Sequence, residues 1–158
     1  MNQNGLIVAV DPGLRNMGWA LFEGGRLKKA GLTKADKKTS DLVVLGGQHV
    51  EQLPDADFVM VEQMLTYKRR GYALPSVMQL AHLAGYVVCS YDAGVLVPAT
   101  TWKGKLSKEE HHDWLLETLP DDDLIIVDEA LSKCPKRLQH NILDAVGMGF
   151  WFVTQEDD

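Results

Sequence analysis

Residues 6–23, LIVAVDPGLRNMGWALFE, decide the predicted fold of this 158-residue chain. Residues 6–10 are apolar and rich in β-branched side chains, which is typical of a strand that is covered on both faces. The Pro-Gly pair after Asp11 lacks one backbone donor and permits positive φ, so the strand ends there and the backbone turns. Residues 19–22 are apolar again and predict a second strand, antiparallel to the first. The carboxylate of Asp11 is therefore expected at the end of a central hairpin.

This hairpin alone leaves two interpretations of Asp11 open. Asp before Pro-Gly is a common turn former, and a carboxylate at the end of a core strand also suits a metal ligand. Two further acids in similar settings favour the metal ligand: Glu62 follows the apolar residues 58–61, and Asp144 lies within the apolar periodic segment 138–153. Carboxylates beside a core are costly unless something neutralises them, and a divalent cation does so.

Length and composition predict one domain spanning residues 1–158. Hydrophobic residues make up 46% of the chain, enough for a core that needs neither disulfides nor a structural metal. The first residues are polar and no apolar run approaches the length of a membrane span, so we expect no signal peptide, no membrane contact and a cytoplasmic location. Cys89 and Cys134 lie far apart without zinc-site spacing, which predicts two reduced thiols.

The net charge of −6 argues against a broad nucleic-acid-binding surface, but the charge is unevenly distributed. Residues 1–79 carry ten Lys/Arg against eight Asp/Glu, whereas residues 80–158 carry six against fourteen. A basic footprint must therefore be local. Two clusters qualify, namely the run Lys68, Arg69 and Arg70 and the trio Lys103, Lys105 and Lys108.

The rest of the chain first adds strands and then interleaves helices. Apolar β-branched runs predict strands, and helical spacing together with capping residues predicts helices. The predicted strands are residues 26–32, 58–61 and 94–97. The predicted helices are residues 41–53, a long helix from Pro75, residues 107–119, and a final helix from Pro135 to about residue 152. Residues 33–40 and 64–74 are predicted loops, residues 124–127 fit either a short strand or a loop plug, and His111 and His112 are predicted to be solvated.

This order of elements, with the last acid on a C-terminal helix, is that of an RNase H-like α/β fold, a central mixed sheet of about five strands flanked by helices. Here AVDPGLRNMGWALFE resembles the first motif of the RuvC family of Holliday junction resolvases, VMVEQM the second and HNILDAVGMG the last. Between them, VPATTWKGKLSKEE resembles the lysine-bearing segment of that family. The resemblance covers nearly the whole chain in the right order, and the short form is similar to phage-type members, which implies a bacterial or phage-infected cell.

The resemblance implies two-metal phosphodiester hydrolysis. Asp11 is expected to bridge two Mg²⁺ ions, for which Mn²⁺ is expected to substitute, with Glu62 on one side and Asp144 on the other. The family places an acid or a His three positions before the last Asp, where this chain has Asn141, preceded by His140. Either residue completes the metal site in this interpretation, and His140 is alternatively a proton shuttle or a surface His. Glu62 is alternatively an acid at a helix N-terminus or at the rim of the fold.

The resemblance also assigns DNA-binding residues. Lys103 and Lys108 match positions where the family places phosphate-binding or catalytic lysines, with Lys105 between them. The segment after Glu62 matches a DNA-probing loop, in which an apolar or aromatic wedge is flanked by cations that grip phosphates. In this chain those candidates are Leu65, Tyr67, Lys68, Arg69 and Arg70. Plain solvation is the alternative for all of these side chains.

Taken together, these features predict a homodimeric Mg²⁺-dependent endonuclease that resolves four-way junctions. The alternatives are a RuvC-fold nuclease acting on RNA or on flap or other branched DNA, and a non-catalytic DNA-binding module. The last is disfavoured because three acids without metal would repel DNA. The turn after Asp11 also resembles the phosphate loop of actin-like ATP-binding folds, but those need a second domain for which this length leaves no room.

Overall fold

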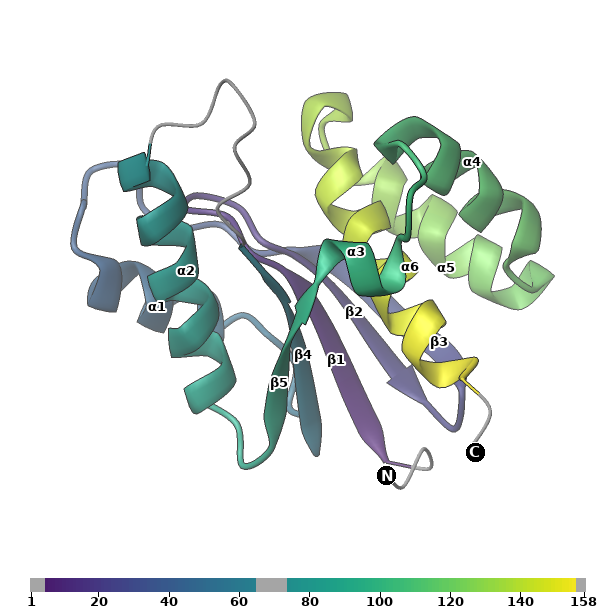
Figure 1. The fold of residues 1–158 in the computed structure, drawn as a ribbon, viewed down its shortest axis with the longest axis horizontal. Helices are drawn as coiled ribbons and strands as arrows, with labels where there is room; N and C mark the ends of the chain where they lie inside the picture. The colour runs from purple at the N-terminus through teal and green to yellow at the C-terminus, as the bar shows by residue number, and fades with distance from the viewer. Residues whose placement is uncertain (1–4, 65–73, 156–158) are drawn as a thin grey trace.

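Five strands form one mixed sheet in the computed structural model, which describes residues 5–64 and 74–155 (Figure 1). The strands are β1 (Leu6–Asp11), β2 (Gly18–Glu23), β3 (Arg26–Leu32), β4 (Phe58–Gln63) and β5 (Gly94–Pro98), in the spatial order β3-β2-β1-β4-β5. β2 runs antiparallel to both β1 and β3, whereas β4 runs parallel to β1 and to β5. The predicted hairpin and the predicted sheet are confirmed, and the carboxyl ends of β1, β3, β4 and β5 all lie at one edge.

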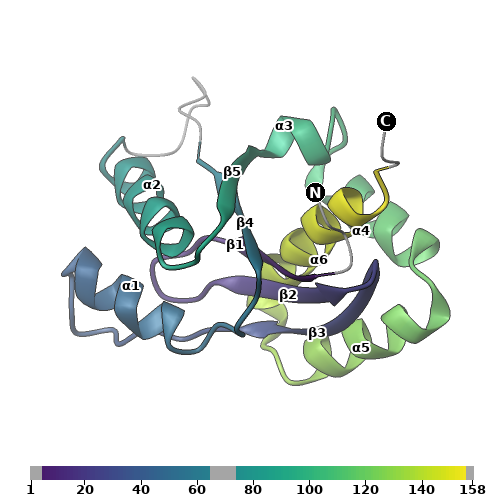
Figure 2. The same ribbon diagram turned by 90° about the horizontal axis from the view of Figure 1, so that it is seen from below.

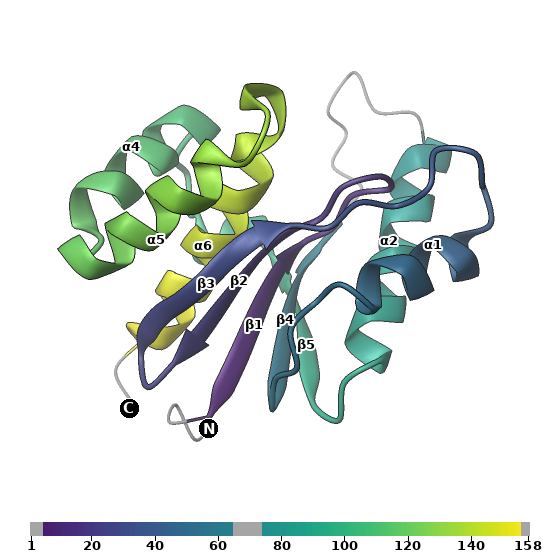
Figure 3. The same ribbon diagram turned by 180° about the vertical axis from the view of Figure 1, so that it is seen from behind.

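Helices cover both faces of this sheet (Figures 2 and 3). One face carries α1 (Leu42–Val50) and α2 (Leu74–Cys89). The other face carries α3 (Ala99–Trp102), α4 (Lys108–Thr118), α5 (Asp121–Ser132), the 3-10 helix η1 (Lys136–Leu138) and α6 (Gln139–Val153).

The central strand β1 contributes to both of the resulting cores. Because side chains alternate along a strand, Ile7 and Ala9 pack in the core under α6, while Val8 and Val10 pack in the core under α1 and α2. All four side chains are buried. This two-sided burial explains why the strand is a continuous apolar run rather than an alternating one.

Capping residues begin two helices where the sequence predicts them. The Asp41 carboxylate accepts hydrogen bonds from the backbone N–H groups of Val43 and Val44 at the start of α1. At the start of α4, the Ser107 hydroxyl accepts from the Glu110 N–H while the Glu110 carboxylate accepts from the Ser107 N–H. This reciprocal capping box makes Lys108 the first residue of α4.

Three details differ from the sequence-based prediction. Residues 124–127 belong to helix α5 and are neither a strand nor a plug, because the preceding acids Asp121, Asp122 and Asp123 lie in the first turn, where the helix dipole favours negative charge. The last α-helix begins at Gln139 and not at Pro135, since η1 lies between them. The single-turn helix α3 was not predicted at all.

Two further observations concern the cysteines and the lengths of the helices. Both cysteines are free thiols as predicted, Cys89 exposed and Cys134 buried. Across residues 5–64 and 74–155, none of the helices has the length and apolar character needed to cross a membrane.

Candidate active site

Asp11 and Glu62 lie side by side at the carboxyl ends of neighbouring parallel strands. Val10 of β1 pairs with Val61 of β4 in the parallel register. Asp11 and Glu62 are the next residues on these two strands, so their backbones lie about 5 Å apart. Ile7 and Ala9 face α6, as do Phe58 and Met60, and the acids are the next residues in these alternating series. Both carboxylates therefore point to the α6 side of the sheet.

Asp144 approaches the same place from the middle of α6. Gly18 pairs with Asp11 across the hairpin, and it lets α6 come unusually close to the sheet. A Cβ atom at Gly18 would lie 1.9 Å from the backbone carbonyl oxygen of Asn141. The glycine in the motif thus allows the first turn of α6 to rest on β2, and Asp144, which is 5% exposed, follows one turn later.

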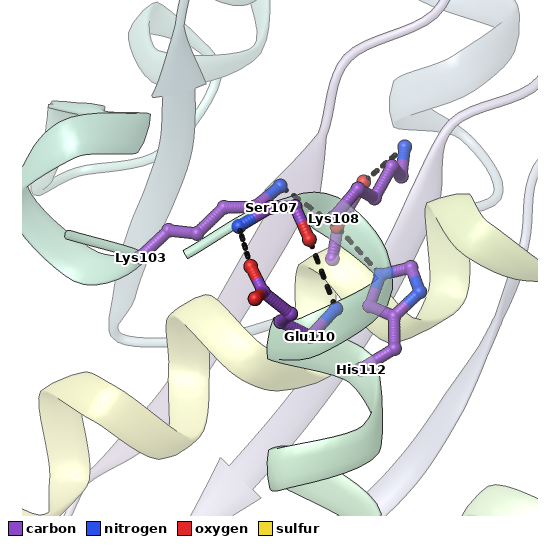
Figure 4. A network of polar contacts seen from close by, with 6 residues as sticks. Lys103, Ser107, Lys108, Glu110 and His112 are labelled. Carbon is purple, nitrogen blue, oxygen red and sulfur yellow. Dashed lines mark hydrogen bonds and ion pairs between the residues drawn. The ribbon is translucent and has the colours of Figure 1, made fainter. Parts of the chain in front are cut away.

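Three basic side chains contact Asp144, and Figure 4 shows them: Lys103, Lys108 and His112. Lys108 Nζ lies 2.6 Å from Asp144 Oδ2, and His112 Nε2 lies 2.8 Å from Asp144 Oδ1. Because these two residues are four apart on α4, they share one helix face. Lys103 Nζ lies 3.9 Å from Asp144 Oδ1 and 5.5 Å from the centre of the Trp102 ring. The capping box that fixes the start of α4 therefore also aims Lys108 and His112 at the site.

The three carboxylates differ in their protonation. Burial, followed by repulsion from Glu62 and Asp144, raises the pKa of Asp11 well above its ordinary value. Burial and then repulsion from Asp144 raise the pKa of Glu62 to about 7. The pKa of Asp144 is lowered, because the hydrogen bond from His112 and the charge of Lys108 outweigh the burial that acts to raise it. Asp144 is thus an ion-paired carboxylate, while burial and repulsion from neighbouring carboxylates disfavour the charged forms of Asp11 and Glu62.

Glu62→Gln is expected to weaken the pH dependence of stability in chelator-treated protein. Since the folded pKa of about 7 lies above the ordinary value of 4.5, stability from Glu62 is present below pH 4.5 and is lost as the pH rises through 7. Melting temperatures measured at about pH 5 and about pH 8 should therefore differ less in the variant, by at least about 4 °C. Parallel behaviour of variant and wild type would mean that Glu62 titrates as in the unfolded chain.

A divalent metal fits the donor chemistry of this site. Mg²⁺ prefers carboxylate oxygens, and a cation would relieve the repulsion that raises the pKa of Asp11 and Glu62. Asp144 differs because both of its oxygens are already engaged. Within the part of the chain that the structure describes, no three His, Cys, Asp or Glu side chains converge closely enough to hold one ion. A metal that uses all three carboxylates must therefore compete with Lys108 and His112 for Asp144.

Asn141 and His140 occupy the first turn of α6. Asn141 is half-buried and lies three residues before Asp144, which puts it on the same helix face. His140 is exposed, and its pKa is lowered by partial desolvation and then by the charge of Lys108. Both residues lie on the helix that carries Asp144, and neither hydrogen-bonds to it within the described residues.

Two side chains at this site were not predicted from the sequence. His112 was predicted to be solvated but hydrogen-bonds to Asp144, and the i, i+4 spacing from Lys108 after the capping box is the signal that could have identified it. Trp102 is buried with no hydrogen-bond partner for its indole nitrogen among the described residues, although its N–H lies close enough to Glu62 to lower the pKa of that carboxyl.

The neighbouring His111 was also predicted to be solvated, and that prediction is wrong. Its ring is 1% exposed and lies edge-on to Trp102 at 4.9 Å between ring centres. Burial, followed by the charge of Lys103, lowers its pKa to about 4, so this imidazole is neutral. The helical period of α4 turns His111 toward the core because Leu115, four residues on, faces the same way.

The predicted DNA-binding residues divide into two groups. Lys103 and Lys108 lie at the carboxylates, and Lys105 is exposed without an ion pair in the described ranges. The predicted DNA-probing loop, with Leu65, Tyr67, Lys68, Arg69 and Arg70, lies outside the described residues.

Comparisons with known proteins identify the fold. No protein-family model matches the chain, and no curated protein sequence matches it. Among solved structures, Thermus thermophilus RuvC in complex with a Holliday junction substrate superposes with a TM-score of 0.55 at 17% identity, covering 92% of this chain and 91% of that one. The yeast mitochondrial Holliday junction resolvase Ydc2 gives 0.63 at 10% identity, covering 93% and 77%.

A fowlpox virus resolvase, solved with Holliday junction DNA, gives a TM-score of 0.57 at 16% identity, covering 94% of this chain and 96% of that one. These similarities extend over 92–94% of this chain. The chain therefore has the RNase H-like fold of the RuvC-type Holliday junction resolvases.

Proposed function

We propose that this protein is a Mg²⁺-dependent, structure-selective endonuclease of phage type that resolves Holliday junctions and related branched DNA as a homodimer. One observation carries the proposal: three carboxylates from β1, β4 and α6 approach one another at a sheet edge, next to Lys103 and Lys108. Phosphodiester hydrolysis requires acidic groups that hold metal ions and adjacent cations that bind the phosphate. The fold shared with three Holliday junction resolvases supports the choice of substrate.

Each side chain of the site has a role in this proposal. Bound Mg²⁺ would activate a water molecule and stabilise the leaving oxygen. Asp11 and Glu62 would hold the metal from the sheet edge, and Asp144 would hold it from α6. Lys108 and Lys103 would bind the scissile phosphate and offset the negative charge that develops on it. His112 would orient Asp144 through its hydrogen bond, as outer-shell partners orient metal ligands.

One cleavage assay tests the proposal. Four-way junction, flap, linear duplex and RNA substrates are incubated with the protein and Mg²⁺, and again with Mn²⁺ or a chelator. Junction cleavage that requires either metal and exceeds duplex cleavage is the expected result. Preferential cutting of RNA or flaps would replace the substrate class while retaining the nuclease, and junction binding without any cleavage would identify a binding module.

The homodimer is supported by an apolar surface on α1 and α2. Val43, Val44 and Met78 are exposed there, and a shallow hollow lies between Val43, His82 and Tyr86. Analytical ultracentrifugation of the wild type and of Val43→Lys/Met78→Lys checks this part. We expect a dimer for the wild type and a monomer for the variant, and a wild-type monomer at all concentrations would contradict it.

Asn141 provides a test of the metal site. Asn141→Asp is expected to keep or raise activity, because it adds the carboxylate that the related family carries at this helical position. Asn141→Leu should raise the Mg²⁺ concentration at half-maximal cleavage about tenfold, since it removes an oxygen ligand. Metal titrations of cleavage measure both effects. An unchanged midpoint in both variants would exclude Asn141 from the site and favour His140.

A further inference from the structure

A basic loop follows the carboxyl end of β3, at the same edge of the sheet as the carboxylates. Asp11 pairs with Gly18 and Gly18 pairs with Leu32, so Leu32 is level with Asp11 two strands away. Two strand spacings amount to about 10 Å. Residues 33–38, TKADKK, continue beyond that level, and a duplex covers the same distance in about three base pairs along its axis.

This loop is built onto the segment that follows Asp11. The Thr33 N–H donates to the Met17 carbonyl at 2.9 Å, and the Ala35 N–H donates to the Arg15 carbonyl at 2.9 Å. The Arg15 guanidinium in turn donates to the Asp36 carbonyl. The loop and the segment therefore extend the β2–β3 ladder past the sheet edge, with Arg15 among the lysines.

Two glutamines hold the loop backbone, Gln48 in α1 and Gln52 in the turn just after that helix. The Gln52 side-chain amide donates to the Lys34 carbonyl at 2.8 Å and accepts from the Lys34 N–H at 2.9 Å. The Gln48 amide oxygen accepts from the Asp36 N–H at 2.9 Å, and the Asp36 carboxylate accepts from the Lys38 N–H at 2.9 Å. These hydrogen bonds fix the backbone conformation of the exposed loop, so its lysines are preorganised for binding.

A buried histidine fixes the base of the same loop. His49 is fully buried, and its Nε2 must donate to the Leu14 carbonyl, which can only accept, at 3.2 Å. Its Nδ1 is then the acceptor for the Thr33 hydroxyl at 2.6 Å, and the Thr33 oxygen accepts from the Met17 N–H at 3.2 Å. This chain of hydrogen bonds joins α1, β3 and the segment after Asp11.

The charge of this region contrasts with the rest of the protein. The loop and the segment after Asp11, residues 33–38 and 12–17, contain four cations, Arg15, Lys34, Lys37 and Lys38. They contain one carboxylate, Asp36, in a chain whose net charge is −6. The three lysines are exposed and form no ion pair within the described residues. By contrast, Lys28 pairs with Glu23 and Lys133 pairs with Glu129.

We propose that Arg15 and residues 33–38 form a phosphate-binding ridge that grips the backbone of a DNA arm beside the cleavage site. This inference depends on the proposed function, because the ridge would bind the same DNA substrate. Its phosphate contacts are separate from those of Lys103 and Lys108. A DNA backbone fits because these cations have no carboxylate partners among residues 5–64 and 74–155, and because the loop that carries the lysines is hydrogen-bonded to the segment after Asp11. A phosphate-binding surface of this kind determines register and affinity and not sequence.

Salt-dependent binding tests the ridge. Junction, linear duplex and duplex RNA binding are measured in chelator with the full-length protein over a series of monovalent salt concentrations. For junctions, Lys34→Ala/Lys37→Ala/Lys38→Ala should bind at least about tenfold more weakly, and its slope of log K against log salt should be shallower by roughly two to three. The matched control Lys28→Ala/Lys29→Ala/Lys133→Ala removes the same charge elsewhere and should retain the wild-type slope.

A second variant separates the effect of the lysine charges on junction binding from the effect of the fixed loop conformation. Gln48→Leu/Gln52→Leu keeps every cation but releases the loop, so it should weaken junction binding severalfold with an unchanged salt slope. A triple lysine variant with the affinity and slope of a junction-binding wild type would overturn the ridge and leave the nuclease proposal standing. A wild type that binds the RNA duplex alone would overturn both the junction substrate and the ridge as a binding surface for a DNA arm. Absence of binding to all three nucleic acids would overturn both.

Discussion

Asp11→Asn, Glu62→Gln and Asp144→Asn are each expected to reduce junction cleavage by at least about a thousandfold while junction binding is retained. The physical reason is that each substitution removes a charge that the proposed metal site requires and leaves the shape of the side chain nearly unchanged. Cleavage is followed with labelled junctions in Mg²⁺, and binding is followed by gel shift in chelator. Loss of binding together with a collapsed melting temperature would show that the carboxylates are scaffold residues instead.

Stability provides the control for this result, because the structure predicts its sign. Asp11→Asn should raise the melting temperature of the metal-free protein, since burial and two neighbouring carboxylates disfavour the charged form of Asp11. Asp144→Asn should lower it, because the substitution leaves Lys108 and His112 without their anion. Opposite shifts in two inactive variants would separate catalysis from folding.

Gly18→Ala is expected to have the largest effect on folding. The added Cβ would lie 1.9 Å from the Asn141 carbonyl oxygen and 2.2 Å from its carbon, and both atoms belong to backbone that no rotamer change can move. Helix α6 must therefore shift away from β2, at a cost of at least about 3 kcal/mol in the free energy of unfolding. In a chain of this size that lowers the melting temperature by about 6–12 °C, measurable by calorimetry.

Cleavage should fall as well, because the displaced helix carries Asp144. The matched control is Gly85→Ala in α2, where an added Cβ meets nothing within 4 Å. A helix-interior glycine replaced by alanine gains roughly 0.5–1 kcal/mol, so this variant should melt at the wild-type temperature or above. Equal stability of the two variants would contradict the close approach of α6 to β2.

The sequence predicts the sheet well because its strands are continuous apolar runs bounded by turn residues. The run before Asp11 and the run before Glu62 both end with an acid, and their parallel pairing brings the acids together as expected. Helix starts are equally local, since the Asp41 cap and the Ser107 capping box depend on residues a few positions apart.

Features that depend on tertiary packing cannot be predicted from local sequence patterns. His112 looks like one polar residue among many in a charged segment, and only the docking of α4 against α6 gives it Asp144 as a partner. Residues 124–127 have strand-like composition, yet the acids in the preceding turn begin a helix. The loop at residues 33–40 has no periodic pattern, and it is held by side chains that come later in the sequence, namely Gln48 and His49 of α1 and Gln52 in the turn after it.

The direction of α6 has a practical consequence for handling the protein. The helix starts beside Gly18 at the working edge of the sheet and ends at Val153, near the amino end of β1 at the far edge (Figures 1 and 3). A group fused after Val153 or before Leu6 is therefore attached at the edge of the sheet opposite the carboxylates. Affinity tags, surface-immobilisation handles or fluorescent proteins attached to either terminus should leave access for a large branched substrate unobstructed.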